Sequence, residues 1–241
     1  MSHPAFELWL IGVMASLGGT SELLDHAMYM LLFNDFLKGV PFATALFLLW
    51  TVPRTQQMDT EREVVLLILC ATTLSLMIGR AIQGLIDSPR PLMVPEVAAM
   101  YPPIFHEYRL DWNAFPSDHM ALYLAVAFGV FLVRRALGTA LIVWCLVGVG
   151  FPRLYAGYHY PIDILGGMAV AAASLALVWF MRGWLRPWLR KALQFAGHYP
   201  ALAMAAMFCL CFQIATVFNT VRELGEFGRA SVRLLRTALL Y

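Results

Sequence analysis

Charge-free apolar segments recur along most of the chain and are the feature that most constrains its fold. They occupy residues 39–53, 64–79, 120–133, 136–152, 164–181 and 192–221. A helix needs about 20 mostly apolar residues to cross a membrane, and these segments approach that length with their flanks. Apolar residues make up 61% of the chain and charged residues only 13%, too little polar surface for a soluble domain. We therefore expect an all-α, polytopic membrane helical bundle.

The positions of the charged residues divide this bundle into segments. We predict about six transmembrane helices near residues 38–55, 62–86, 117–135, 137–156, 161–182 and 198–219. Acidic and basic side chains interrupt residues 5–37, which indicates interfacial helices, although a seventh span at 5–21 is an alternative. Residues 221–241 carry arginines and leucines at helical spacing, which predicts an amphipathic tail. We expect residues 1–241 to form a single membrane domain.

Net charge and the placement of basic residues bear on partners and orientation. The formal net charge of +2 is too small for a polyanion-binding face, so we expect no nucleic-acid partner. Basic residues flank the first, third and fifth predicted connections: Arg54, Arg62, Arg134, Arg135, Arg182, Arg186, Arg190 and Lys191. The positive-inside rule places these connections in the cytoplasm. The loop at 87–116 and the turn at 153–160 then face outside, whereas the arginines of the tail contradict the same rule.

Three polar clusters interrupt the apolar background, all on the predicted outer side. They are Ser88-Pro89-Arg90-Pro91, then Phe115-Pro116-Ser117-Asp118-His119, and then Pro152-Arg153 with His159, Pro161 and Asp163. Ionisable residues at membrane boundaries are costly and usually functional. Any one cluster is unremarkable, because a single histidine near a span end is commonly an interfacial side chain. Together, two histidines, two arginines and an aspartate predict a phosphate site.

Each residue type has a physical reason to be in such a site. Arg90 and Arg153 can offer forked donors to phosphoryl oxygens. Ser117 is the expected N-cap of a helix whose free N–H groups favour an anion. Asp163, four residues after His159, can hold one imidazole nitrogen and leave the other as a nucleophile. His119 can then donate a proton to the leaving group.

These clusters resemble the motifs of the type 2 phosphatidic acid phosphatase family of integral membrane lipid phosphatases. That family has Lys-x6-Arg-Pro, Pro-Ser-Gly-His and Ser-Arg-x5-His-x3-Asp. Arg90-Pro91 match the end of the first motif, residues 116–119 match the second with Asp118 in place of glycine, and Arg153, His159 and Asp163 match the third. Asp118 and the run 159–163 are most similar to the bacterial undecaprenyl pyrophosphate phosphatase branch. The resemblance covers residues 60–182, the expected catalytic core.

The resemblance implies a metal-independent hydrolase without cofactors, in the bacterial inner membrane, with its site facing the periplasm. It implies that His159 attacks phosphorus and forms a phosphohistidine while Asp163 orients it. It further implies that His119 protonates the departing oxygen and later activates water. Arg90, Arg153 and Ser117 would hold the phosphoryl oxygens.

The implied substrate is a lipid phosphate or pyrophosphate, with a polyprenyl pyrophosphate favoured. Phosphatidic acid, phosphatidylglycerophosphate and transfer to an acceptor lipid are the enzymatic alternatives. A lipid-binding protein or a transporter that reuses the fold is the alternative outside catalysis. The oligomeric state is not predicted.

Two departures from the family motifs concern the phosphate contacts. Gln83 stands where the family has lysine, and Pro152 stands where it has serine. Arg80 lies one turn earlier on the same helix face and is a candidate to replace the lost charge, unless it only extends toward the interface. Arg109 is a candidate contact to a second phosphate or head group; the alternative is a solvated loop.

Overall fold

The computed structural model describes residues 5–52, 58–106 and 112–219, and every regular element within these ranges is a helix. The N-terminal part comprises α1 (Ala5–Leu17), α2 (Glu22–Phe33), α3 (Asp35–Lys38), α4 (Val40–Thr51), α5 (Met58–Leu85), η1 (Pro91–Met93), α6 (Pro95–Ala98) and η2 (Pro103–Phe105). The C-terminal part comprises α7 (Asp118–Val133), α8 (Arg135–Trp144), η3 (Cys145–Gly150), α9 (Phe151–Tyr155), α10 (Pro161–Phe180), α11 (Arg182–His198) and α12 (Pro200–Ala215). The all-α fold is confirmed.

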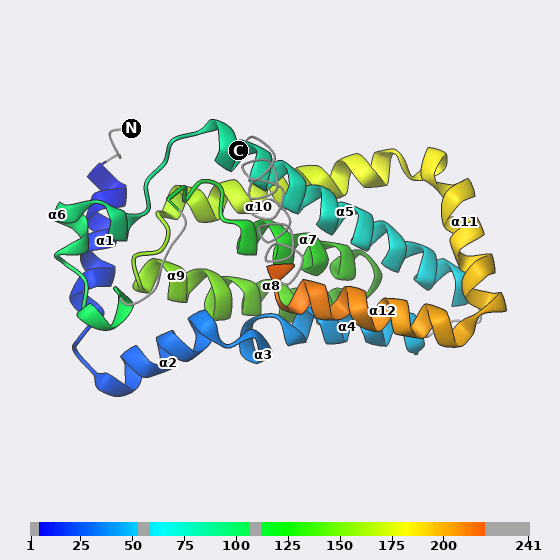
Figure 1. Cartoon of the computed structure of the whole chain (residues 1–241), viewed down its shortest axis with the longest axis horizontal. Coiled ribbons are helices and arrows are strands. Elements are labelled where there is room, and N and C mark those ends of the chain that lie inside the picture. The colour runs from blue at the N-terminus through cyan, green and yellow to red at the C-terminus, as the bar shows by residue number, and fades with distance from the viewer. Residues whose placement is uncertain (1–4, 53–57, 107–111, 220–241) are drawn as a thin grey trace, which may run out of the picture.

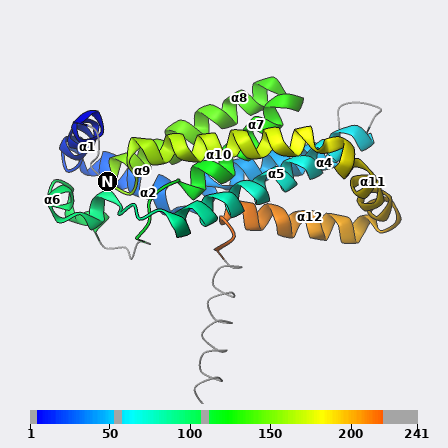
Figure 2. The same ribbon diagram turned by 90° about the horizontal axis from the view of Figure 1, so that it is seen from above.

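The long helices lie side by side along the long axis of the molecule. Figure 1 shows α4, α5, α7, α8, α10 and α12 along this axis, while α1 and α11 cross it at opposite ends. Figure 2, seen from above, shows the same two crossing helices at the two ends. The arrangement is that of a membrane helical bundle with transverse helices at its ends.

Helix α7 forms the centre of the bundle. Its sequence, Asp118–Val133, is apolar on every face after the first two residues, as expected for a helix surrounded by others. It packs against α4, α5, α8 and α10. Small residues permit the close approach: a Cβ added at Gly167 of α10 would lie 2.6 Å from the carbonyl oxygen of Ser117. This tight contact fixes the start of α7 against α10.

The number of spans is not confirmed by helix length. Within the part of the chain that the structure describes, three helices are long and apolar enough to cross a membrane, namely Glu61–Leu85, Arg135–Tyr155 and Pro161–Phe180. The predicted spans at 38–55 and 117–135 contain the shorter helices α4 and α7. The expected span at 198–219 contains α12, which meets α11 at a bend of 119°. The predicted tail at 221–241 lies outside the described residues.

The positions of proline and glycine explain why some helices are shorter than the predicted spans. Gly39 is the N-cap of α4, Pro41 lies in its first turn, and Pro200 is the first residue of α12. Proline fits the first turn of a helix but not its interior. The alternative span at 5–21 holds α1, whose apolar part Phe6–Leu17 is also short. Charge-free length therefore overestimates helix length where proline or glycine interrupts a run.

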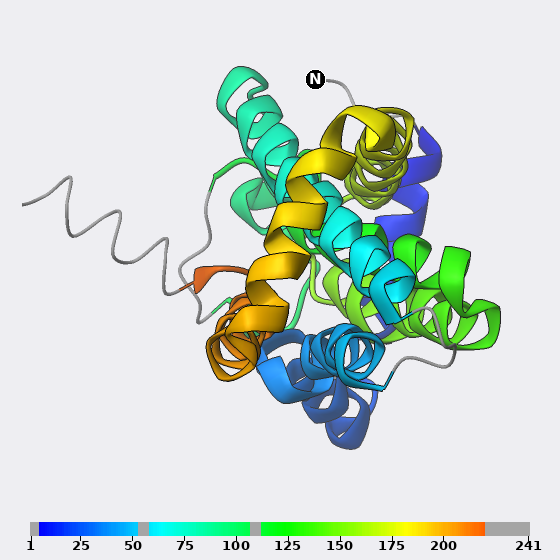
Figure 3. The same cartoon turned by 90° about the vertical axis from the view of Figure 1, so that its right-hand side faces the viewer.

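Helix α11 crosses one end of the bundle and is amphipathic. Its exposed face carries Trp184 and Trp188, and its arginines begin at Arg182. Figure 3 views the molecule from this end, with α11 in front of the long helices. Tryptophan and arginine together are typical of a membrane interface.

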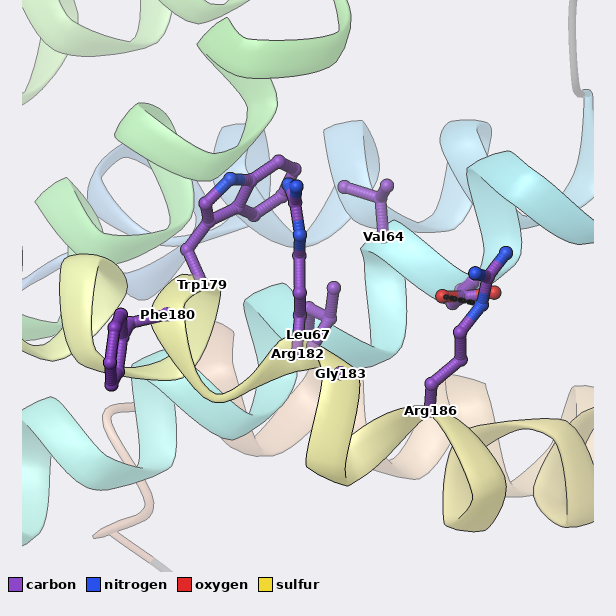
Figure 4. A pocket seen from close by; sticks show the side chains of 8 residues that line it. Val64, Leu67, Trp179, Phe180, Arg182, Gly183 and Arg186 are labelled. Carbon is purple, nitrogen blue, oxygen red and sulfur yellow. Dashed lines mark ion pairs between the residues drawn. The ribbon is translucent and has the colours of Figure 1, made fainter.

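A pocket of about 510 Å³ lies where α11 meets α5 and α10. Figure 4 shows its lining, with Arg182 over the ring of Trp179 at 4.9 Å and Arg186 paired with Glu63 at 3.3 Å. Glu63 and Leu67 belong to the first turns of α5, whereas Arg80 and Gln83 belong to its last turns. The pocket is therefore at the opposite end of α5 from the predicted phosphate site.

Candidate active site

The three polar clusters meet at the end of the bundle where α5 ends and α7 and α10 begin. The amide Nε2 of Gln83 donates to the carbonyl oxygen of Pro116 at 2.8 Å. The N–H of Ser117 donates to the carbonyl oxygen of Asp163 at 3.0 Å. Nη1 of Arg90 donates to the carbonyl oxygen of Tyr158 at 2.9 Å. The third cluster is thus hydrogen-bonded to the second through Ser117 and reached by the first through Arg90, while Gln83 of α5 bonds the second.

His159 lies in a buried turn directly before α10. Gly157, at a φ of +71°, permits the turn, and a Cβ added there would lie 2.8 Å from the ring of Tyr101. Oδ2 of Asp163 accepts from the N–H of Tyr160 at 2.7 Å and lies 3.4 Å from Nδ1 of His159. A carboxylate beside Nδ1 favours the tautomer protonated there, which leaves a lone pair on Nε2.

The guanidinium of Arg90 faces the other nitrogen of this imidazole. Nη1 of Arg90 lies 3.2 Å from Nε2 of His159. Burial lowers the pKa of His159 and the positive charge of Arg90 lowers it further, while Asp163 raises it. The net lowering keeps the imidazole neutral near pH 7, the form that a nucleophile needs.

Arg153 reaches the site from a distorted helix. Residues Cys145–Gly150 form a π-helix directly before α9, and Pro152 brings no N–H to the ladder that follows. Nη1 of Arg153 donates to the carbonyl oxygen of Val149 at 2.9 Å, and its side chain is buried. The carbonyl oxygen of Arg153 accepts from the N–H groups of Tyr158 and His159. The backbone of Arg153 therefore helps to hold the turn that carries His159.

Ser117 occupies the N-cap position of α7, as predicted, but its hydroxyl makes no capping hydrogen bond. Oδ1 of Asp118 instead accepts from the N–H of His119 at 2.8 Å. Oγ of Ser117 is buried and has no hydrogen-bond partner among the described residues. The expected capping role is corrected here, and the buried hydroxyl is free to contact a ligand.

Asp118 links Arg80 to His119, and Gln83 is bonded to Arg80. Nη2 of Arg80 donates to Oδ2 of Asp118 at 2.8 Å, and Nη1 donates to Oε1 of Gln83 at 3.1 Å. Nδ1 of His119 lies 2.8 Å from Oδ1 of Asp118. Arg80 and Gln83 thus lie beside the Asp118–His119 pair, and their contact with phosphate stays a prediction. Arg109 lies outside the described residues.

Two polar residues that sequence reasoning did not select also hold this end of the bundle. Nδ2 of Asn113 donates to the carbonyl oxygen of Gln83 at 2.7 Å, and its Oδ1 accepts from the N–H of Ser88 at 3.1 Å. Oε1 of Glu7 in α1 accepts from the N–H of Ile162 at 3.1 Å. A lone amide in a loop and an acid 155 residues away carry no local pattern that would reveal these contacts.

A family model for the PAP2 superfamily matches residues 64–187, about half of the chain and including all three clusters. The chain belongs to the PAP2 superfamily. Its helical fold and its ordered motifs are those expected of a PAP2 membrane protein, so the resemblance inferred from the motifs is confirmed.

Three known proteins are similar to this PAP2 chain. Undecaprenyl-diphosphatase BcrC of Bacillus subtilis (strain 168) is 30% identical over 62% of the chain and 72% of that protein. Bacitracin transport permease protein BcrC of Bacillus licheniformis is 34% identical over 31% of the chain and 36% of that protein. A protein of Escherichia coli (strain K12), provisionally named undecaprenyl-diphosphatase YbjG, is 24% identical over 79% of the chain and 84% of that protein. No solved structure is significantly similar to the chain.

Proposed function

We propose that this PAP2 protein is a membrane lipid phosphatase that hydrolyses undecaprenyl pyrophosphate or a closely related lipid pyrophosphate. The convergence of the three motifs carries the proposal, above all the placement of His159 between Asp163 and Arg90. Two of the similar proteins are named undecaprenyl-diphosphatases. In this proposal residues 60–182 form the catalytic core of a single membrane domain, and no metal or other cofactor takes part.

His159 is the proposed nucleophile and His119 the proposed acid and base. Nε2 of His159 donates its lone pair to phosphorus while the bond from phosphorus to the bridging oxygen breaks, and His119 gives that oxygen a proton. In the second half, His119 takes a proton from water as the water oxygen bonds to phosphorus and the phosphorus–nitrogen bond breaks. Lipid monophosphate and inorganic phosphate are the products, and both histidines return to their starting states.

Arg90, Arg153 and Ser117 are the proposed contacts to the phosphoryl oxygens. Arg90 lies beside Nε2 of His159, where phosphorus must approach. Oγ of Ser117, which finds no hydrogen-bond partner in the described part of the chain, and the N-terminus of α7 add donors for negative charge. Charge developing on the phosphoryl oxygens is then met by groups that are already in place.

The site faces the periplasm in the proposed orientation. Arg134 pairs with Glu61 at 3.1 Å, and Arg186 pairs with Glu63 at 3.3 Å. The basic residues at the start of α5, the α7–α8 junction and α11 therefore share one end of the bundle, and the site lies at the other. The positive-inside rule assigns the basic end to the cytoplasm, which supports an inner-membrane protein.

Phosphate release by the purified protein tests the function. We expect release from undecaprenyl pyrophosphate to exceed release from phosphatidic acid and phosphatidylglycerophosphate, to persist in excess EDTA, and to be inhibited by vanadate. Vanadate adopts a trigonal-bipyramidal form similar to the phosphoryl-transfer transition state. Loss of activity on chelation, restored by Mg²⁺, would overturn the metal-free mechanism. Binding or transport of lipid without phosphate release would overturn the enzymatic assignment.

We also propose that Arg80 supplies the positive charge that lysine supplies in the family motif. Arg80→Ala should lower kcat/KM by roughly 10–1,000-fold, the loss of about 1.4–4 kcal/mol of transition-state stabilisation. Gln83→Lys in the same chain should restore part of the activity. Arg62→Ala, at the other end of α5 and bonded to the carbonyl oxygen of Trp50, is the matched control. A change of less than about threefold in Arg80→Ala, with Gln83→Lys alone raising turnover, would contradict the proposal.

A further inference from the structure

Asp118 occupies a position where the family motif has glycine, directly before His119. Its side chain is 6% exposed. Oδ1 accepts from the N–H of His119 and lies 2.8 Å from Nδ1 of the same residue. Oδ2 accepts from Nη2 of Arg80 at 2.8 Å. The carboxylate thus joins the imidazole on α7 to a guanidinium on α5.

The surroundings of His119 repeat those of His159. At His159, one oxygen of Asp163 accepts from a backbone N–H and lies near Nδ1. At His119, one oxygen of Asp118 accepts from a backbone N–H and lies near Nδ1. In both pairs the carboxylate faces Nδ1, so that Nε2 is left for the substrate. The site therefore holds two Asp–His pairs rather than one.

We propose that Asp118 is the positioning residue of His119 and fixes Nε2 as the nitrogen that exchanges protons with the substrate. This inference rests on the proposed function, since it assigns a partner to the proposed acid and base. Nδ1–H of His119 donates to Oδ1 of Asp118 in every state of the reaction. Arg80 holds the other oxygen, which prevents the carboxylate from turning away from the ring.

The proton balance of the reaction explains why a carboxylate is useful there. To act as the acid in the first step, His119 must hold a proton on each nitrogen, and Oδ1 of Asp118, 2.8 Å from Nδ1, lies where it can accept the hydrogen bond of one of them. The proton on Nε2 passes to the oxygen that leaves phosphorus, while the proton on Nδ1 stays with Asp118. In the second step Nε2 recovers a proton from the attacking water. Only one nitrogen changes its protonation, and the ring need not reorient between steps.

Leaving-group dependence separates a positioning role from a structural one. Asp118→Asn should lower kcat on the lipid pyrophosphate by about 10–100-fold, a part of what general acid–base catalysis contributes. It should have a much smaller effect on an aryl phosphate, whose departing oxygen needs little protonation. In a His119→Ala chain, Asp118→Asn should cause less than about threefold further loss. Equal losses on both substrates, and a full further loss in the His119→Ala chain, would show that Asp118 only joins α5 to α7.

A matched control and a spectroscopic measurement complete the test. Asp25→Asn removes another buried carboxylate, which accepts hydrogen bonds from the hydroxyl of Tyr155 and the N–H of Gly19. This variant should keep kcat within about threefold of the wild-type value. Nitrogen-15 NMR of the imidazoles should show neutral His119 protonated at Nδ1, with a shift toward the Nε2–H tautomer in Asp118→Ala. An unchanged tautomer would overturn the inference. This measurement needs no turnover, so it decides the role of Asp118 even if no lipid phosphate proves to be a substrate.

Discussion

Replacing His159 with alanine should abolish phosphate release, with a fall in kcat of about 10⁴-fold or more. The imidazole is the only group of the protein that the proposed mechanism bonds to phosphorus, and in the alanine variant Arg90 and Arg153 have no nucleophile to assist. Initial rates on undecaprenyl pyrophosphate measure the effect. Acid-labile, base-stable radiolabel on the wild-type protein, absent from the variant, would identify the phosphohistidine directly.

A second histidine provides the control for this substitution. His198 lies at the end of α11, exposed, with Nδ1 against the carbonyl oxygen of Gln194 at 3.0 Å. His198→Ala should release phosphate at a near-wild-type rate. If His159→Ala keeps substantial activity while its thermal unfolding is unchanged, the covalent mechanism is wrong. Asp163→Asn should be milder than His159→Ala, because the nucleophile itself stays in place.

Replacing His119 with alanine should lower kcat on lipid pyrophosphate by about 10²–10⁴-fold, the usual contribution of a general acid or base. The loss should be smaller on an aryl phosphate, because its leaving oxygen departs without a proton. Hydrolysis of the phosphohistidine also needs His119, so the covalent intermediate should accumulate when the aryl phosphate is used. Rapid-quench measurement of bound radiolabel tests both expectations.

The opposite pattern would reassign the residue. If His119→Ala loses equal activity on all leaving groups and no intermediate accumulates, His119 serves binding rather than proton transfer. Ser117→Ala is a useful companion variant, since it removes a hydroxyl next to His119 without touching either imidazole. Its effect should be independent of the leaving group, because the hydroxyl meets phosphoryl oxygens that are present in every substrate.

Much of the fold and site can be predicted from this sequence because the signals are local. Apolar runs demand helices in a membrane, and the spacing from His159 to Asp163 brings a carboxylate back to the imidazole that precedes the helix. Arg90 against His159 could be anticipated only through the order of the motifs, since 69 residues separate them. The structure places Asp163 and Arg90 beside the imidazole of His159, while their catalytic roles stay predictions.

The remaining features depend on packing and could not be read from the sequence. Helices are shorter than the predicted spans because Pro200 begins α12 inside a longer apolar run and α4 begins only after its N-cap Gly39. The hydroxyl of Ser117 does not cap α7, because the neighbouring carboxylate of Asp118 takes the N–H of His119. Glu7 supports the start of α10 from a helix at the other end of the sequence. Each of these features depends on which groups lie close together in the folded protein and compete for the same hydrogen bonds.

Asp163 has a consequence for how this protein tolerates change over generations. The same oxygen that faces His159 also accepts the N–H of Tyr160 at the first turn of α10. A substitution there loosens the beginning of a long helix and disorients the nucleophile at once. Selection for a protein that inserts and folds therefore also acts on the carboxylate that is proposed to orient His159. A lineage that loses this carboxylate therefore loses helix stability and the orientation of the His159 imidazole in a single step.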